Sequence, residues 1–160
     1  MKNISEKIAK QEEIDRNNFK DFINAHGKGY TFEEQGIGET YDVLLRKNDK
    51  KWVVEIKTRQ MYKCDDFNES YIDWSKIEEL FRHYYELKAD GCYAVAFFPL
   101  SDKVVLWKLN EFEQFNVKER KLNKTTMKSR DEKTTKKVVC LPLVPDERTF
   151  VYSYKYDFYE

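Results

Sequence analysis

The feature that most constrains the fold of this chain is a β-hairpin in its first half. Two runs of residues with high β-propensity, Tyr41–Lys47 and Lys51–Arg59, flank a polar dipeptide at positions 48 and 49. Such a pattern is typical of strands joined by a two-residue turn. A turn of that length fixes the pairing of the strands and places Asp42 directly opposite Glu55. Their Cβ atoms would then lie about 4.5–5.5 Å apart, near enough for both carboxylates to bind one cation.

The two faces of this hairpin differ in chemistry. Side chains alternate between faces along a strand, so Lys57 lies on the same face as Glu55 and Asp42. Two carboxylates that face each other repel unless something compensates their charge, and a divalent metal ion would do so. The opposite face is an apolar layer made of Tyr41, Val43, Leu45, Trp52, Val54 and Ile56.

Two simpler interpretations of the charged face stay open. The triplet acid-x-Lys is common in a chain with 36% charged residues, so the face could be an ordinary solvated surface or carry only a cross-strand ion pair. Leu44 and Val53 share this face, however, which indicates that it is at least partly covered.

Composition favours a folded globular protein. The chain has 160 residues, of which 41% are hydrophobic and 16% aromatic, so we expect one domain over residues 1–160. Its 29 basic and 29 acidic side chains cancel, so any contact with nucleic acid must come from a local patch. No apolar run suits a membrane span or a signal peptide, and three widely spaced cysteines suit neither a disulfide framework nor a zinc site. We therefore expect a reduced, cytoplasmic protein.

Hydrophobic periodicity predicts two long helices. The first, over residues 5–25, carries apolar side chains on one side and ends at the glycines that follow. The second begins near Ser75, which forms a capping box with Glu78, and ends before Gly91. A short third helix is expected near residues 110–115.

The predicted strands lead to a fold class. Besides the hairpin, β-propensity indicates strands at residues 30–35, 92–98, 104–109 and 138–143 and in the aromatic tail from 150, with a polar loop over 60–71. A helix, a three-stranded meander, a helix and further strands pack most economically as a mixed central β-sheet flanked by helices, of the α/β or α+β class. We expect the core at about residues 5–109 and a small C-terminal β extension at about 110–160.

With Asp42 on one strand and Glu55-Ile56-Lys57 on the next, the sequence resembles the PD-(D/E)XK nuclease superfamily. The resemblance covers about residues 5–109 and implies a restriction-endonuclease-like core. Tyr41 stands where the motif is named for proline. The segment from Ile72 to Leu80 and the apolar run after it are similar to the later part of Holliday-junction-resolvase-like and small restriction-type members.

The resemblance also implies the chemistry of the site. Asp42 and Glu55, with the main-chain carbonyl of Ile56, would bind Mg²⁺, or Mn²⁺ in its place, against the scissile phosphate. The metal would lower the pKa of a bound water and neutralise charge on the phosphate, while Lys57 orients that water. Lys76 falls where a polar residue of the second helix assists the site in such proteins. No organic cofactor is expected.

Many members of the superfamily add an acid from the first helix. At 100° per residue, Glu12 and Asp15 fall on the core-facing stripe of that helix, whereas Glu13 points away. We take Glu12 as the candidate and leave open which of these acids serves. A frayed or partly exposed helix edge would give Glu12 no such role.

A basic segment, Lys118–Lys137, holds nine Lys or Arg residues and three acids, with Thr and Ser residues between them. Its charges and hydroxyl groups suit contacts with phosphates. The alternative is a mobile, solvated loop without a binding role. The candidate nucleic-acid contacts are Lys124, Lys128, Arg130 and Lys136.

Together these observations predict a single-domain, magnesium-dependent endodeoxyribonuclease that hydrolyses phosphodiester bonds of a branched junction or a restriction-type DNA substrate. DNA is the expected partner, no membrane is involved, and the aromatic tail leaves a homodimer open. The alternatives are a catalytically silent DNA-binding module on the same fold and a protein-interaction module in which the charged face is incidental. Binding of a divalent metal near neutral pH would separate the nuclease from the second of these.

Overall fold

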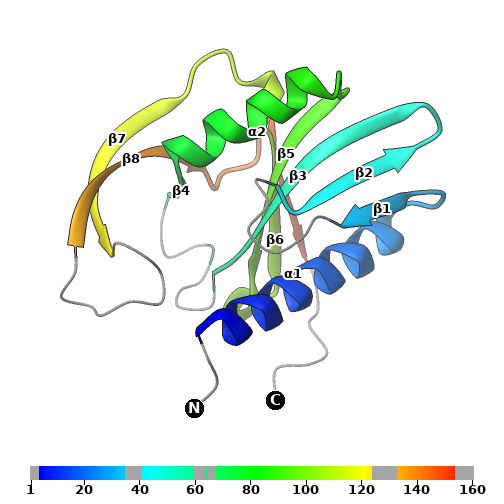
Figure 1. Ribbon diagram of the computed structural model, residues 1–160, viewed down its shortest axis with the longest axis horizontal. Coiled ribbons are helices and arrows are strands. Elements are labelled where there is room, and N and C mark those ends of the chain that lie inside the picture. The colour runs from blue at the N-terminus through cyan, green and yellow to red at the C-terminus, as the bar shows by residue number, and fades with distance from the viewer. Residues whose placement is uncertain (1–3, 35–40, 60–63, 65–67, 124–132, 154–160) are drawn as a thin grey trace.

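A mixed β-sheet forms the centre of the protein (Figure 1). The structure is a computed structural model and describes residues 4–34, 41–59, 64, 68–123 and 133–153. Within these ranges, neither helix combines the length and hydropathy of a membrane span. The strands of the central sheet, in spatial order, are β1 (Thr31–Glu34), β2 (Val43–Lys47), β3 (Lys50–Thr58), β5 (Gly91–Phe98), β6 (Lys103–Lys108) and β9 (Thr149–Ser153).

Two helices and a second sheet cover the central sheet. Helix α1 (Ile4–His26) packs on one face, and α2 (Trp74–Glu86) packs on the other, together with strands of the second sheet. The predicted fold class, a mixed sheet flanked by helices, is therefore confirmed. The second sheet, in spatial order, consists of β4 (Glu69–Asp73), β8 (Lys133–Pro142) and β7 (Asn116–Asn123).

The hairpin of β2 and β3 has the predicted register. Val43 pairs with Val54, and Lys47 pairs with Lys50 across a two-residue turn. Asn48 in that turn has φ 55°, a left-handed conformation that asparagine tolerates better than most residues. β5 runs parallel to β3, so a crossover must connect them, and α2 lies within that crossover.

Aromatic side chains of α1 close the first face of the sheet. Phe19 and Phe22 are 1% and 2% exposed. Gly27 N donates to the carbonyl of Ile23 at 2.9 Å at the end of the helix, and Gly29, with φ +84°, turns the chain toward β1. The two aromatic rings pack on the apolar layer predicted from the hairpin and on its continuation in the next strands, namely Val43, Leu45, Val54, Ile56, Val95, Phe97, Val104 and Leu106.

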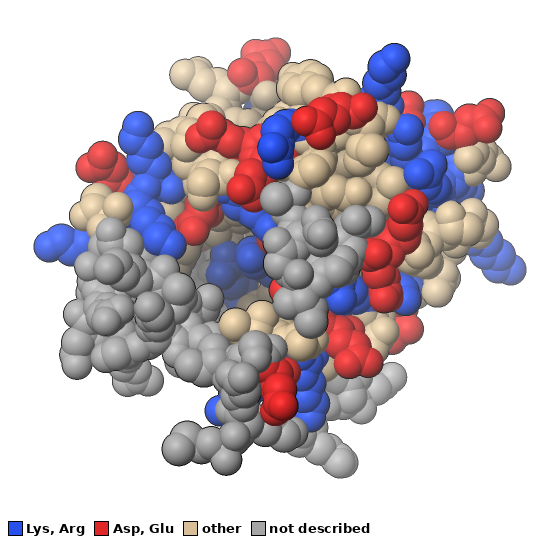
Figure 2. Space-filling model, in the orientation of Figure 1, with Lys and Arg blue, Asp and Glu red and all other residues tan. Residues whose placement is uncertain are grey.

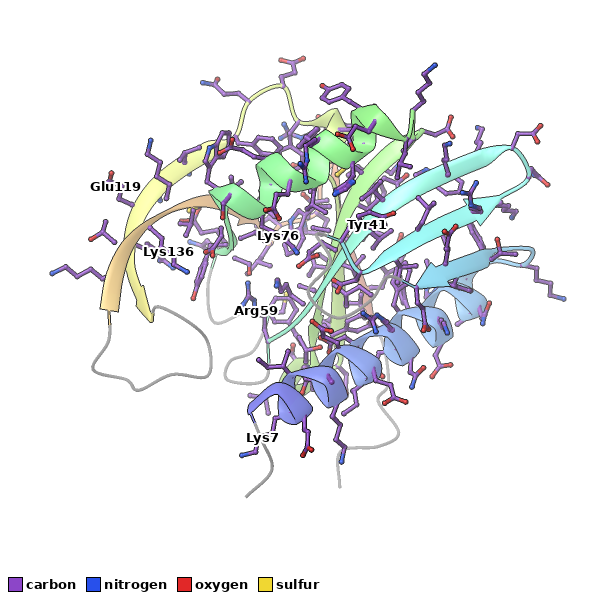
Figure 3. The ribbon with its side chains drawn as sticks, viewed as in Figure 1. Lys7, Tyr41, Arg59, Lys76, Glu119 and Lys136 are labelled. Carbon is purple, nitrogen blue, oxygen red and sulfur yellow. The ribbon has the colours of Figure 1, made fainter. Side chains whose placement is uncertain are left out.

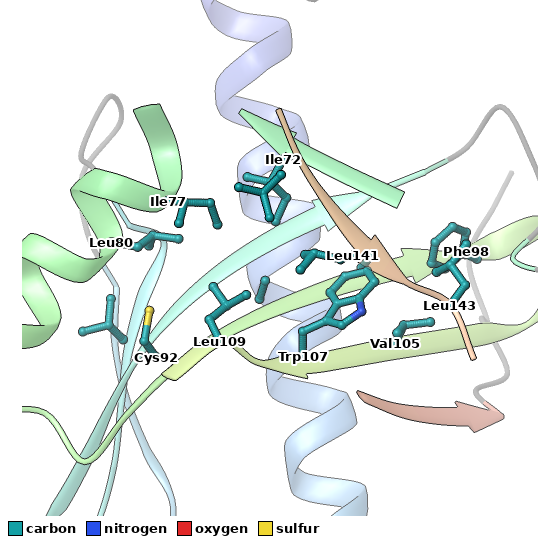
Figure 4. Close-up of a cluster of buried hydrophobic side chains, with 14 of the residues drawn as sticks. Ile72, Ile77, Leu80, Cys92, Phe98, Val105, Trp107, Leu109, Leu141 and Leu143 are labelled. Carbon is teal, nitrogen blue, oxygen red and sulfur yellow. The ribbon is translucent and has the colours of Figure 1, made fainter. Parts of the chain in front are cut away.

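The opposite face carries a second apolar cluster between α2, the central sheet and the second sheet (Figure 4). Ile77 and Leu80 of α2 are buried there. Trp107 of β6 is 1% exposed, and its Nε1 donates to the carbonyl of Pro142 at 2.7 Å. This bond satisfies the buried indole N–H and ties β8 to the central sheet. The 3₁₀ turn η2 (Pro99–Ser101) connects β5 to β6.

The predicted capping box at Ser75 is wrong. α2 begins one residue earlier, at Trp74, and its N-cap, Asp73, makes no side-chain hydrogen bond to the helix. The Asp73 carboxylate lies instead 3.5 Å from Lys136 Nζ. An ion pair across two neighbouring strands thus takes the carboxylate that the helix end would otherwise use.

Two further predictions are wrong in part. Residues 69–71, expected in a loop, belong to β4. In the basic segment, residues 118–123 and 133–137 belong to β7 and β8, so the alternative of a solvated loop does not hold for them. The helix expected at residues 110–115 is only the 3₁₀ turn η3 (Leu109–Glu111), after which the rings of Phe112 and Phe115 stack 5.6 Å apart. Pairing with other strands satisfies the main-chain hydrogen-bonding groups of these polar segments. The pattern of residues within one segment does not reveal this pairing.

Gly91→Ala should destabilise the junction of β3 and β5. A Cβ at position 91 would lie 2.5 Å from Trp52 Cδ1 and 3.1 Å from Tyr93 Cε1, so the Trp52 ring must move. We expect a loss of about 1–3 kcal/mol in the free energy of unfolding, measured by denaturant titration. In a Trp52→Ala background the same change should cost less, and an equal loss in both backgrounds would contradict this contact.

Candidate active site

Asp42 precedes β2 at the point where β3 continues past its partner. Asp42 N donates to the carbonyl of Val54 at 3.1 Å, and Asp42 Oδ2 accepts a 2.7 Å hydrogen bond from Ile56 N. The carboxylate therefore accepts the main-chain hydrogen bond that the carbonyl of a further β2 residue would otherwise have accepted. Because the N–H and C=O of a strand residue point to the same side, the Ile56 carbonyl faces this same edge.

Glu55 is the buried acid of the site, with 2% of its surface exposed. Its Oε1 lies 3.0 Å from Lys57 Nζ on the same strand, and its Oε2 lies 3.4 Å from Lys76 Nζ on α2. The contact with Lys76 is an ion pair without the angles of a hydrogen bond, so Oε2 has no hydrogen-bond partner in the described structure. The structure thus brings Asp42, Glu55, Lys57 and Lys76 together.

The Glu55 carboxyl is poised to change its charge near neutral pH. Burial raises its pKa to about 7, Lys57 opposes this shift, and the neighbouring Asp42 adds to it. Burial disfavours the charged amine of Lys57, but the Glu55 carboxylate outweighs it and raises the pKa of that amine. Lys57 therefore stays protonated, while Glu55 is shared between its protonated and ionised forms around pH 7.

Asp15 is the acid of α1 that is tied to the hairpin. Its Oδ1 accepts hydrogen bonds from Thr58 Oγ1 at 2.6 Å and from Gln11 Nε2 at 2.8 Å. Burial raises the pKa of Asp15, the two hydrogen bonds oppose this shift, and the charge of Asp42 adds to it. The charges of Asp15 and Asp42 therefore interact.

Glu12 makes a different set of contacts. Its Oε2 lies 3.7 Å from the Arg16 guanidinium one helical turn away, and this carboxylate atom is buried without a hydrogen-bond partner in the described structure. Among the described residues, Glu12 makes no side-chain hydrogen bond to β3. The role of Glu12 in the site stays a prediction.

The α2 side of the site is partly aromatic. The ring of Tyr41, expected on the α1 face with Val43, lies 5.0 Å from the ring of His83 on α2. Tyr41 precedes the first residue of β2, so the alternation of strand side chains does not hold it to that face. Its ring instead packs against the apolar cluster between α2 and the sheets.

A hollow with basic side chains at its floor opens beside these residues. Figure 2 shows it below α2 on the face toward the viewer, and Figure 3 places Lys76 and Arg59 in the same part of that view. Arg59 directly follows β3, two residues after Lys57. Its Nη2 donates to the carbonyl of Tyr71 at 2.6 Å. No motif of the sequence indicates Arg59 or Tyr71, and only the position of Arg59 two residues after the motif lysine could have pointed to it.

The predicted nucleic-acid contacts are only partly within the described structure. Lys136 lies on β8 and pairs with Asp73 at 3.5 Å. Lys124, Lys128 and Arg130 lie outside the described residues. Their contribution to binding stays a prediction.

The oxygen atoms at this edge of the hairpin suit a hard divalent cation. Among the described residues, no group of three or more His, Cys, Asp or Glu side chains is placed to hold a metal ion. Mg²⁺ is, however, commonly bound by one or two carboxylates and keeps several waters. Asp42 and Glu55 would supply two carboxylates and the Ile56 carbonyl a third oxygen, and Glu55 Oε2 is not engaged in a hydrogen bond. The residues present therefore fit Mg²⁺.

Comparison with known proteins finds a distant structural likeness. No family model matches the chain, and no curated protein matches it. Among solved structures, the chain is similar to a Holliday junction resolvase of the archaeal hyperthermophile Archaeoglobus fulgidus, with a TM-score of 0.46 and 14% sequence identity. The match covers 62% of this chain and 80% of the resolvase.

Without metal, stability should fall as pH rises through the range in which Glu55 ionises. The Glu55 pKa is about 7 in the fold against 4.5 for an ordinary glutamate, so the folded state binds more protons between these values. The free energy of unfolding should therefore decrease over this range, by at most about 1.4 kcal/mol per pH unit for this group. Chemical denaturation in EDTA at several pH values measures the slope.

Glu55→Gln provides the control for that slope. The variant should lose the contribution of Glu55 and, above pH 7, should be at least as stable as the unchanged protein, because an isosteric neutral group replaces a buried charge. Asp15, whose pKa is also raised, should account for slope that remains. A clear loss of stability of Glu55→Gln at pH 8 would instead identify Glu55 as part of a structural ion pair.

Proposed function

We propose that this chain is a magnesium-dependent endodeoxyribonuclease that hydrolyses DNA phosphodiester bonds with a metal-activated water. The observation that carries the proposal is the buried Glu55 carboxylate, which lies beside Asp42 and between the amines of Lys57 and Lys76. A buried acid next to a second acid lowers the stability of a fold. Such pairs therefore occur mainly where they serve a function. Binding a cation for phosphoryl chemistry is a use that suits these residue types.

Asp42, Glu55 and the Ile56 carbonyl would hold the metal ion. When bound, Mg²⁺ neutralises charge on the phosphate and lowers the pKa of a water ligand, and Mn²⁺ can replace it. The hydrogen bond from Ile56 N to Asp42 Oδ2 fixes the orientation of that carboxylate before any cation arrives. Pre-orientation of this kind reduces the cost of assembling the site.

Lys57 and Lys76 have separate roles in this proposal. The Lys57 side chain is 41% exposed, so its amine can reach solvent and the substrate while its stem stays on the strand. It would orient the attacking water and stabilise negative charge in the transition state. Lys76, 23% exposed on α2, would hold the Glu55 carboxylate in place and add positive charge to the site.

The proposed substrate is DNA, in the form of a branched junction or a restriction-type duplex site. The resemblance of Asp42 and Glu55-Ile56-Lys57 to the PD-(D/E)XK motif supports this class of substrate. In the proposal, Lys124, Lys128, Arg130 and Lys136 add affinity for the DNA backbone and take no part in the chemistry.

One observation favours a catalytically silent DNA-binding or protein-interaction module as the second candidate. Two lysines already lie near the Glu55 carboxylate, so its charge is compensated without a cation. On that alternative the cluster is a buried ionic network with a structural role. Metal binding and cleavage assays on purified protein separate the two candidates.

Asp42→Asn and Glu55→Gln should each reduce Mg²⁺-dependent cleavage of plasmid and four-way-junction DNA by about 100-fold or more, because each removes a charged metal ligand. Calorimetric titration with Mg²⁺ should show weaker binding by both variants. In the unchanged protein, Mg²⁺ binding should weaken as pH falls below about 7, where Glu55 takes up a proton.

Asp49→Asn is the matched control for these variants. Asp49 is an exposed acid of the same hairpin, in the turn between β2 and β3, so its replacement should leave metal binding and cleavage unchanged. Full activity of Asp42→Asn, or Mg²⁺ binding that survives Glu55→Gln at every pH, would exclude the proposed site.

Asp15→Asn and Glu12→Gln decide which acid of α1 serves the site. Asp15 is bonded to Thr58, next to Lys57, whereas Glu12 contacts Arg16 on its own helix. We therefore expect Asp15→Asn to reduce cleavage by about tenfold or more, as for other positioned acid–base groups, and Glu12→Gln to reduce it less. The opposite order in single-turnover rates would assign the role to Glu12, as the sequence predicts.

A further inference from the structure

Two arginines from distant parts of the chain contact one tyrosine ring beside the candidate active site. The guanidinium carbon of Arg59 lies 5.2 Å from the centre of the Tyr71 ring, and that of Arg120 lies 4.9 Å from it. Arg59 comes from the end of β3, and Arg120 comes from β7 in the second sheet. Tyr71 on β4 thus gathers two positive charges at the join between the sheets.

The face of the second sheet that carries Tyr71 is otherwise neutralised. Cross-strand partners share a face, and on this one Lys118 lies 3.0 Å from Glu69 while Lys136 lies 3.5 Å from Asp73. Among the described residues, no carboxylate lies within salt-bridge distance of the guanidinium of Arg59 or Arg120. Among the described residues at this face, these two arginines are the basic side chains without a carboxylate at salt-bridge distance.

Arg59 also has a hydrogen-bond donor without an acceptor. Its Nη2 donates to the Tyr71 carbonyl, but its Nε is buried and has no hydrogen-bond partner in the described structure. A buried donor without an acceptor costs free energy, as do two like charges held at one ring. An anion bound between the two guanidinium groups would reduce the repulsion between their charges.

The position of this pair identifies the kind of anion. Arg59 follows the proposed catalytic Lys57 by two residues, and Figure 3 shows it between α1 and α2, where Figure 2 shows the hollow with a basic floor. A phosphate of the substrate strand next to the scissile phosphate would enter the same hollow. Guanidinium groups bind such oxygens with paired hydrogen bonds.

We propose that Arg59 and Arg120, held by Tyr71, form a subsite for a backbone phosphate that flanks the scissile phosphate of DNA. The inference rests on the proposed nuclease function. In it, the second sheet is the part of the protein that positions the substrate strand relative to Asp42 and Glu55. Contacts of this kind fix the register of the DNA and carry no information about its base sequence.

The test measures binding without cleavage. A fluorescently labelled duplex oligonucleotide is titrated with Arg59→Gln, Arg120→Gln and the unchanged protein in EDTA, at several salt concentrations. Each variant should bind about tenfold more weakly, and the slope of log affinity against log salt should decrease by about 0.9 for each phosphate that the variant no longer neutralises. Arg120 is exposed, so Arg120→Gln keeps the test valid if Arg59→Gln does not fold.

Lys121→Gln is the matched control. Lys121 is the exposed neighbour of Arg120 on β7, and the alternation of strand side chains places it on the opposite face of the sheet. Lys121→Gln removes one positive charge, as Arg120→Gln does, but from the opposite face of the sheet. The affinity and salt slope of Lys121→Gln should therefore match those of the unchanged protein. Equal effects of Arg120→Gln and Lys121→Gln, or no effect of Arg120→Gln, would overturn the subsite, as would failure of the unchanged protein to bind the duplex.

The outcome for the subsite is distinguishable from that for catalysis. If Arg120→Gln weakens binding while the unchanged protein shows no metal-dependent cleavage, the arginines bind a backbone phosphate, but the nuclease proposal is wrong and the chain is a DNA-binding module. If the unchanged protein cleaves DNA but Arg120→Gln binds normally, the nuclease proposal stands and the subsite is wrong.

Discussion

Burial of one carboxylate, that of Glu55, sets the requirements for everything placed around it. An acid that is 2% exposed in the middle of a sheet loses its hydration, and the fold must supply other charges or keep the acid protonated. Lys57 supplies charge from the same strand, and Lys76 supplies it from α2. The position of Lys76 depends in turn on the burial of Ile77 and Leu80. The packing of α2 on the sheet therefore also determines the charge balance at the site.

The part of the site that lies on the hairpin could be predicted because it is local. A two-residue turn and the alternation of strand side chains determine the register, and the register then determines that Asp42 stands beside Glu55 and that Lys57 shares their face. Periodicity likewise located α1 and α2, because each buries one apolar stripe. Lys76 was expected from the resemblance, and its contact with Glu55 follows from the way α2 packs.

The rest of the site depends on contacts between segments that are far apart in the sequence. Thr58 bonds Asp15 on α1, and helical angles alone left Asp15 and Glu12 equivalent. The strands β4 and β7 and the first half of β8 carry little hydrophobic pattern, and their main-chain groups are satisfied by pairing with one another. The cluster of Arg59, Tyr71 and Arg120 exists only after that second sheet has formed, so no short motif could have indicated it.

The lysines that compensate Glu55 also bear on how a cation could enter. A divalent ion at the carboxylates would supply the charge that Lys57 and Lys76 supply without it, so the lysines and the ion would compete for the same oxygens. Lys57, at 41% exposure, can turn its amine to solvent at small cost, whereas Lys76, at 23%, has less freedom. Of the two lysines, Lys57 is therefore the one whose amine could more easily leave Glu55 and reach the hollow where, on the proposed function, the substrate phosphate binds.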